Sequence, residues 1–353
     1  MMRKINIIKP VAISLVTTYK CTAACTDCCF QCSPQQKDRL SLEQMEEFVV
    51  NATSVYPSIR LVAITGGECF TLGEDLFRLV QFIHQNGLRS RIVTNGSWAI
   101  SMEKSRAIIK RLLSVGLDEI NFSTGDSHQQ YVPIDSVVNG IIAAQEQKMM
   151  TAVNVEYNQN FKYTAQDLKE NPRLTEYIGS PYLFVLSGAW IPLSQHLNDE
   201  EQTDSNKHAV FLNQTSRCKQ LFKVMTLAPQ EELLCCCGLT TRKHPYLSLG
   251  TIHNRNLEKI WEGQFDDFIK IWLYAEGPLK ILEFARSIDP SITIDTEHSM
   301  HTCALCMQIL SNEQIINVIK QNYSKIISRV LLEYAIQTNV KNKISSLYEK
   351  EKK

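Results

Sequence analysis

The sequence has no excess of charge of either sign and no long apolar run. Lysine plus arginine equals aspartate plus glutamate at 37 each among 353 residues, so the chain as a whole attracts neither nucleic acid nor anionic lipid strongly. No apolar run approaches the roughly 20 residues of a membrane-spanning helix, and residues 1–10 lack the apolar segment and cleavage site of a signal peptide. We therefore expect no nucleic acid and no membrane among its partners, and a cytoplasmic location.

Cysteine is the residue type that the sequence has in unusual number. Twelve cysteines in a chain expected in a reducing compartment point to metal ligation and not to disulfides. Five of them lie in the stretch "YKCTAACTDCCFQCSP" (19–34), and six of the other seven lie beyond residue 217. The sequence therefore predicts two separate groups of thiols.

Strand-like apolar runs alternate with helix-like patterns up to about residue 190. Strands are expected at 11–16, 60–65, 90–95, 118–123, 151–157 and 182–187, and helices at 41–56, 76–87, 101–115, 134–147 and 165–170. This alternation predicts an α/β fold with a parallel sheet and helices outside it, as an open doubly wound sheet or as a full or partial barrel. Ligands of such folds bind at the carboxyl ends of the strands.

The five-cysteine stretch follows the first predicted strand. Cys21, Cys25 and Cys28 have the spacing C-x3-C-x2-C, and three thiolates in one loop suit a [4Fe-4S] cluster with one iron left open for a small molecule. A structural zinc site is the alternative, although zinc prefers four protein ligands. Cys29, Cys32 and Cys69 exceed the needs of this cluster and are expected to be packed free thiols.

Small and polar residues follow the next strands. Gly66 and Gly67, with Glu68 beside them, stand after the second strand, where the glycines let the backbone pass close to a ligand. Asn95 ends the third strand, and Ser123 and Asp126 follow at the end of the fourth. Each of these last three taken alone also fits a turn or a helix cap.

The cysteine loop followed by "TGGE" resembles the radical S-adenosylmethionine superfamily over roughly residues 11–190. The resemblance implies a partial (β/α)6 barrel over 11–195, with Cys21, Cys25 and Cys28 as ligands of a [4Fe-4S] cluster whose open iron binds S-adenosylmethionine (AdoMet). Gly66, Gly67 and Glu68 would meet the methionyl amine, and Asn95, Ser123 and Asp126 the rest of the cofactor. An electron donor such as flavodoxin or ferredoxin is implied as a partner. Asp27 departs from the family, which commonly has an aromatic residue there.

The second group of thiols lies in a region predicted to be a smaller domain over 209–310. "CKQLFKVMTLAPQEELLCCCG" (218–238) reads as a hairpin with its turn at "APQEE", and "CALC" (303–306) has the spacing of a ligand pair. A lone cysteine, a cysteine on the hairpin arm and this pair total the four thiols of a closed cluster, with zinc as the alternative. The region, with "LGTIHNRNLEKIWEG" (249–263), resembles the SPASM or twitch domains of peptide-modifying radical enzymes. The resemblance implies one auxiliary [4Fe-4S] cluster, and we choose Cys218, Cys236, Cys303 and Cys306 as its ligands. A last helix (313–334) and a charged tail are expected over 311–353.

Within that class the sequence resembles the peptide epimerases of the epipeptide type. "CCFQCSP", "TGGE", "TNGSW", His128 after Asp126, the consecutive cysteines and the final C-x2-C recur in that order. The resemblance implies that a radical removes the Cα hydrogen of an L-residue in a ribosomally synthesised precursor peptide. It also implies that Cys237 returns a hydrogen atom to that Cα from the opposite face. Cys235 fits either role, as ligand or as donor.

Two other functions stay open. A thioether or carbon–carbon cross-link in a peptide uses the same cofactors, and a non-enzymatic metal-binding protein uses the same thiols. The first strand begins about ten residues into the sequence, so we expect a peptide to be held by the barrel mouth, by the hairpin domain or by another protein.

Overall fold

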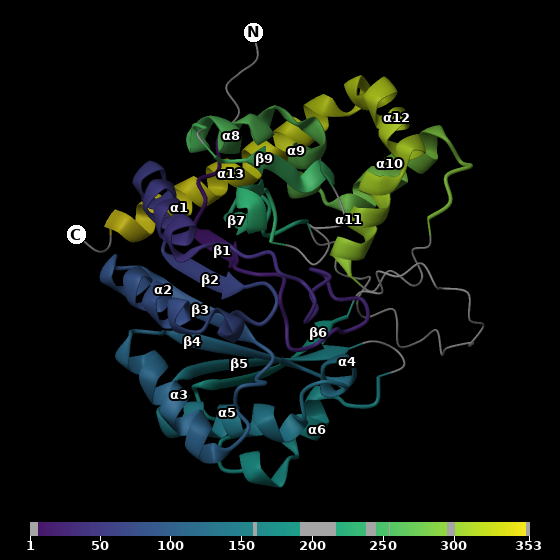
Figure 1. Cartoon of the computed structure of the whole chain (residues 1–353). Coiled ribbons are helices and arrows are strands. Elements are labelled where there is room, and N and C mark those ends of the chain that lie inside the picture. Colours follow the sequence, from purple (N-terminus) through teal and green to yellow (C-terminus); the bar gives the residue numbers. More distant parts are fainter. Residues whose placement is uncertain are drawn as a thin grey trace.

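One sheet of nine strands runs through the protein (Figure 1). The computed structural model describes residues 6–157, 161–190, 217–237, 245–253, 255–294 and 301–350. The strands are β1 (Ala12–Val16), β2 (Leu61–Thr65), β3 (Arg89–Thr94), β4 (Glu119–Thr124), β5 (Met150–Tyr157), β6 (Leu183–Ala189), β7 (Val224–Ala228), β8 (Glu232–Leu234) and β9 (Ser248–Thr251). Their order is β6-β5-β4-β3-β2-β1-β7-β8-β9.

Helices connect the strands and form the C-terminal part. The α-helices are α1 (Leu42–Val55), α2 (Glu74–Gln85), α3 (Met102–Ser114), α4 (Asp126–Gln129), α5 (Ile134–Glu146), α6 (Ala165–Lys169), α8 (Leu257–Gly263), α9 (Phe268–Ala275), α10 (Pro278–Ile288), α11 (Thr302–Ser311), α12 (Glu313–Asn322) and α13 (Ile327–Lys350). Short 3-10 helices are η1 (Cys69–Leu72), η2 (Pro172–Leu174), η4 (Pro229–Glu231), η6 (Pro245–Leu247), η7 (Gln264–Asp266) and η8 (Tyr323–Lys325).

The predicted α/β fold is confirmed, and all six predicted strands are present within two residues of their expected bounds. Strands β1 to β6 lie in chain order and pair in parallel, which is the order of a barrel. Helix α1 begins where the sequence indicates, because Ser41 and Gln44 form a reciprocal capping box. Helices α1, α2, α3 and α5 lie along the outer side of the sheet (Figure 1).

The C-terminal hairpin extends the same sheet. Strand β7 pairs in parallel with β1, with Ala12 opposite Val224, and β8 returns antiparallel to β7 after the Pro229–Glu231 turn. The predicted hairpin is therefore present, but its cysteines follow β8 and do not lie on it, since that strand ends at Leu234. Because β7 adjoins β1, the second group of thiols is anchored beside the strand that carries the first.

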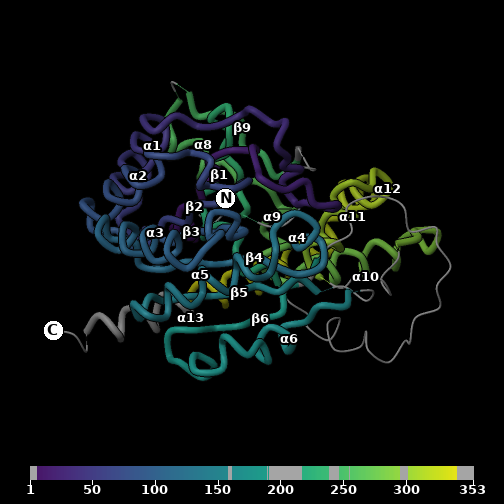
Figure 2. Tube along the Cα trace, turned by 60° about the horizontal axis from the view of Figure 1, so that its bottom comes forward, coloured from purple at the N-terminus to yellow at the C-terminus, as the bar shows by residue number. Residues whose placement is uncertain are grey.

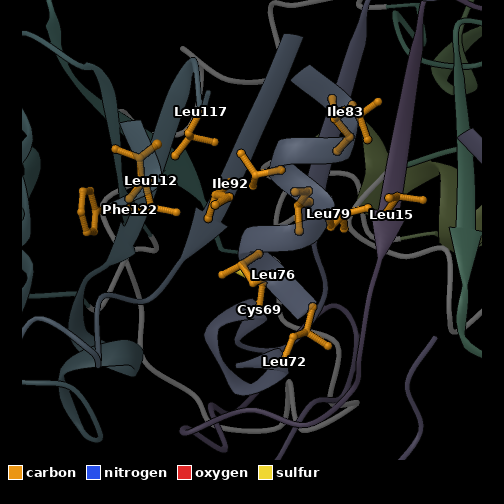
Figure 3. Close-up of a cluster of buried hydrophobic side chains, with 14 of the residues drawn as sticks. Leu15, Cys69, Leu72, Leu76, Leu79, Ile83, Ile92, Leu112, Leu117 and Phe122 are labelled. Atoms are coloured by element: carbon orange, nitrogen blue, oxygen red, sulfur yellow. The ribbon is translucent and has the colours of Figure 1, made fainter. Parts of the chain in front are cut away.

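Two apolar cores hold these elements. The larger core fills the space between the sheet and helices α1, α2, α3 and α5, and Figure 3 shows Leu76, Leu79 and Ile83 of α2 facing Ile92 and Leu15 of the sheet. The second core joins α9, α10, α11, α12 and α13 around Trp272 and Tyr274. The chain therefore has separate cores under its N-terminal and C-terminal parts.

The prediction of one helix over 313–334 is wrong. Helix α12 ends at Asn322, the η8 turn follows, and α13 starts at Ile327. The amphipathic pattern continues across the break because Ile315, Ile319 and Val330 all enter the second core, so periodicity alone does not show the change of direction. Among the helices of the described residues, none combines the length and the apolarity needed to cross a membrane.

Candidate functional site

The cysteine loop runs from the carboxyl end of β1 to α1 and is tied to the end of β2. The backbone N–H of Thr17 donates to Thr65 O at 2.9 Å, that of Gly67 to Thr18 O at 2.7 Å, and that of Glu68 to Lys20 O at 3.0 Å. Three bonds over four residues hold the start of the loop rigidly against the next strand. The loop therefore lies where ligands of parallel α/β sheets bind.

The two glycines of "TGGE" make this contact sterically possible. An added Cβ on Gly67 would stand 2.1 Å from Lys20 O, and one on Gly66 would stand 2.5 Å from Thr18 O. Gly66 also has a φ of +121°, which side chains rarely adopt. The closest neighbour of both glycines is therefore the backbone of the cysteine loop. The absence of side chains at Gly66 and Gly67 allows the end of the second strand to lie this close to the loop.

Glu68 is buried and binds the end of the third strand. Its carboxylate accepts from Thr94 Oγ1 at 2.9 and 3.0 Å and from the backbone N–H groups of Asn95 at 2.8 Å and Phe70 at 3.1 Å. Burial raises the pKa of Glu68, and these hydrogen bonds act against that shift. The carboxyl ends of β2 and β3 are thereby locked together beneath the loop.

Asn95 connects this framework to the first thiol. Its Nδ2 donates to Thr22 Oγ1 at 3.0 Å and lies 3.6 Å from Cys21 Sγ, and its Oδ1 accepts from the Ser97 N–H at 3.0 Å. Asn95 was predicted as a cofactor residue, and the structure places it beside the loop that would hold the cluster. An amide N–H directed at a cysteine sulfur is a typical contact of a metal-bound thiolate.

The predicted cluster ligands interact with one another. The charge of Cys28 acts on both Cys21 and Cys25, and burial raises the pKa of Cys21 to about 11 and that of Cys25 to about 12. A hydrogen bond from the Cys32 side chain lowers the pKa of Cys28 to about 6. Three sulfur donors whose charges act on one another, in a loop held by a buried framework, fit the ligand set of a three-cysteine [4Fe-4S] cluster.

The remaining two thiols of the loop point to different neighbours. Cys32 is buried in a cluster with Val16, Tyr19, Ala228 and Leu234, against which Cys21 and Cys28 also pack. Cys29 packs instead on Ala304, with Cys303 and Met307 of α11. Both were predicted to be packed thiols, and the structure shows that one packs toward the first site and the other toward the C-terminal cysteines.

Ser123 and Asp126, the two residues predicted at the end of the fourth strand, have different neighbours. Ser123 is half-buried on β4, opposite Asn154 of β5. The Asp126 carboxylate accepts from the backbone N–H groups of Lys162 and of Tyr163, the latter at 3.0 Å. Asp126 therefore holds the segment that follows β5, and both of its oxygens are engaged there.

Glu156 is a site residue that the sequence reasoning missed. It is 4% exposed, accepts from His128 Nδ1 at 2.9 Å and from the His128 N–H at 3.1 Å, and also binds the Ser127 N–H. Its charge acts on Cys25 and that of His128 acts on Cys28. The available signal was an acidic residue at the carboxyl end of the fifth strand, "NVEY".

Two aromatic side chains, Tyr131 and Trp190, donate hydrogen bonds to the cysteine loop. Tyr131 OH donates to Ala24 O at 2.8 Å, and Trp190 Nε1 donates to Thr26 O at 3.2 Å. Trp190 also stands edge-on to His128, with ring centroids 5.3 Å apart. The ends of β4 and β6 are thus connected to the cysteine loop through its own backbone carbonyls.

The C-terminal cysteines also gather. The Cys236 side chain hydrogen-bonds Cys218, which lowers the pKa of Cys218 to about 6. Burial raises the pKa of Cys306 well above its usual value, and the charges of Cys218 and Cys303 add to that rise. The four predicted ligands are thus linked pairwise, and as four thiols they fit the donor set of a closed cluster.

The three consecutive cysteines differ in exposure. Cys235 is fully buried and Cys236 is 8% exposed, whereas Cys237 is half-buried. Burial raises the pKa of Cys237 to about 11, so its thiol keeps its proton at neutral pH. In the part of the chain that the structure covers, no three Cys, His, Asp or Glu side chains converge on one metal ion; the ligands of a four-iron cluster bind separate irons and stand farther apart.

Comparison with known proteins places this geometry in context. No family model matches the chain. Over 131 residues, which are 37% of this chain, the sequence is 28% identical to YydG of Bacillus subtilis (strain 168), whose name connects it with peptide biosynthesis. The match covers 40% of that relative's length, so the chain matches less than half of it.

Solved structures match over nearly the whole chain. Native anSMEcpe with bound AdoMet has a TM-score of 0.55 and 12% sequence identity, covering 91% of this chain and 99% of its own. The same protein with AdoMet and the Cp18Cys peptide has a TM-score of 0.53, 12% identity and the same coverage. The likeness shows that this chain shares the fold of these AdoMet-bound structures.

Proposed function

We propose that this chain is a radical AdoMet enzyme that converts L-residues to D-residues in a ribosomally made peptide. The packing of Cys29 on Ala304, which Cys303 also contacts, carries the proposal, because it joins the cysteine loop to the helix that bears the C-terminal cysteine pair. In Figures 1 and 2 the segment after β1 lies beside α11 in both views. A peptide bound at the cysteine loop would then be within reach both of the cofactors held by the loop and of the C-terminal cysteines.

The first site holds the radical-generating cofactors. Cys21, Cys25 and Cys28 would hold a [4Fe-4S] cluster, and Glu68 and Asn95 would lie near bound AdoMet. Supplied with one electron, these cofactors would provide the 5′-deoxyadenosyl radical that removes hydrogen from the peptide Cα. The framework of Glu68, Thr94 and Asn95 orients the loop. Ser123 remains a further candidate for cofactor contact, whereas both carboxylate oxygens of Asp126 already bind the segment after β5.

The second site returns the hydrogen. Cys218, Cys236, Cys303 and Cys306 hold the auxiliary cluster, and the Cys237 thiol gives its hydrogen atom to the opposite face of the Cα radical. Cys237 is assigned this role because it is the most exposed of the three consecutive cysteines. A second electron and a proton then restore its S–H bond, so each event draws two electrons from a donor such as flavodoxin or ferredoxin.

The Cys237→Ala variant tests this assignment. We expect it to cleave AdoMet in the presence of the peptide encoded beside its gene but to form no D-residue, which chiral amino-acid analysis after hydrolysis measures. Cys235→Ala is the matched control, because its thiol is fully buried, and it should retain the product. Full product from Cys237→Ala would contradict the donor role, and loss only in Cys235→Ala would transfer that role to Cys235.

A further inference from the structure

The cysteine loop contains two overlapping copies of the same motif. Cys21, Cys25 and Cys28 form one C-x3-C-x2-C set, and Cys25, Cys29 and Cys32 form a second. Both sets follow the same strand, so spacing alone assigns the cluster equally well to either. The two sets share Cys25, so one of them must leave two thiols with another task.

Packing separates the two sets. The Cys29 side chain packs on Ala304 of α11, which Cys303 and Met307 also contact. Cys21 and Cys28, by contrast, both pack against the buried cluster that contains Cys32, and Cys21 receives the Asn95 amide. Cys21 and Cys28 thus share one cluster whereas Cys29 packs on α11, which favours the first set as the ligands and leaves Cys32 for another task.

Backbone pairing fixes Cys32 beside the ligands. The Cys21 N–H donates to Ser33 O at 3.1 Å and the Ser33 N–H donates to Tyr19 O at 3.2 Å, which forms a short parallel bridge between Lys20 and Ser33. Cys32 is 5% exposed, enclosed by Val16, Ala228 and Leu234 among others. Cys28 packs against the buried cluster that contains Cys32, which brings the two side chains within reach of a hydrogen bond.

We propose that Cys32 is a positioning residue whose S–H donates to the Cys28 thiolate of the cluster and raises the cluster's reduction potential. A donor directed at a ligand sulfur withdraws negative charge, and the reduced cluster carries one more negative charge than the oxidised one. The bond therefore stabilises the reduced form more. This inference rests on the proposed function only in requiring that Cys28 ligates a cluster.

The test is a potentiometric titration of the full chain, reconstituted anaerobically and followed by electron paramagnetic resonance. The loop cluster is identified as the one whose signal changes when AdoMet is added, and its midpoint potential is then measured without AdoMet. Cys32→Ala and Cys32→Val remove the donor, and the valine keeps most of the buried volume. Cys32→Ser keeps a donor, and Cys29→Ala removes a neighbouring half-buried thiol that packs on α11.

We expect Cys32→Ala and Cys32→Val to retain the wild-type iron content and to shift the midpoint to a more negative potential. Cys32→Ser and Cys29→Ala should stay close to wild type. An unchanged midpoint in both donor-free variants overturns the proposal. Loss of the loop cluster in Cys29→Ala and Cys32→Ala, with retention in Cys21→Ala, also overturns it, because the second motif would then be the ligand set. Wild-type protein without iron would instead refute the proposed function.

Discussion

Replacing Gly67 by alanine is expected to separate the end of β2 from the cysteine loop. The new Cβ would lie 2.1 Å from Lys20 O, 2.7 Å from Lys20 C and 3.2 Å from Tyr19 C. All three neighbours are backbone atoms, so no flexible side chain can yield. The φ of Gly67 is not among the positive values, and lack of space is therefore the sole cause of the effect.

The size of the effect follows from the contacts that must break. Moving the strand end away lengthens the bonds Gly67 N–H to Thr18 O, 2.7 Å, and Glu68 N–H to Lys20 O, 3.0 Å, each worth about 1 kcal/mol. Forcing a methyl group into packed backbone adds about 1–3 kcal/mol. We expect Gly67→Ala to lower the free energy of unfolding by about 3–5 kcal/mol in total.

Urea denaturation of the metal-free, reduced protein, followed by circular dichroism, measures this loss. Gly263→Ala is the matched control, because an added Cβ there meets nothing within 4 Å and its φ of −58° is helical; the change should be neutral or stabilising by up to about 1 kcal/mol. The iron bound after reconstitution should fall only in Gly67→Ala. Equal stability of the two variants would refute the close packing of "TGGE" on the loop.

Two further substitutions test the missed residue and a predicted one. Glu156→Gln removes the buried charge that binds His128 and should lower the free energy of unfolding by about 2 kcal/mol. Glu146→Gln is the control, because the ion pair of Glu146 with Arg106 lies at the surface, and it should change the free energy of unfolding by at most about 0.5 kcal/mol. Equal shifts of the melting temperature in the two variants would contradict this prediction. Asp126→Asn loses one of two backbone acceptor contacts and should cost about 1 kcal/mol, with AdoMet affinity by equilibrium dialysis unchanged. A large loss of affinity would make Asp126 a cofactor residue.

The strands and their helices could be predicted from the sequence because each is local. The apolar runs at 11–16 and 60–65 have the length and composition of buried parallel strands, and Ser41 marks the start of α1 by a cap that needs only the next three residues. The carboxyl ends of parallel strands meet at one edge, so the positions of Glu68 and Asn95 beside the cysteine loop also followed.

Long-range pairing could not be predicted in the same way. Nothing local in "KVMTLA" shows that β7 would pair with β1, some 210 residues earlier in the chain. The contact of Cys29 with α11 depends on that pairing, as does the burial of Cys32 against Ala228 and Leu234. The sequence therefore predicted Cys29 and Cys32 as packed thiols but not what they pack against, and the contact of Glu156 with His128 could not be predicted without the pairing of β5 with β4.

The central claim is tested most directly by running the reaction in heavy water. Anaerobically reconstituted protein, a reductant, AdoMet and the peptide encoded beside its gene are incubated together, and the peptide mass is measured. A solvent-exchanged Cys237 thiol would return deuterium to Cα, so the account predicts a gain of one mass unit for each altered residue. A loss of two hydrogens from the peptide, with no deuterium gained, would show a new bond and would contradict epimerisation.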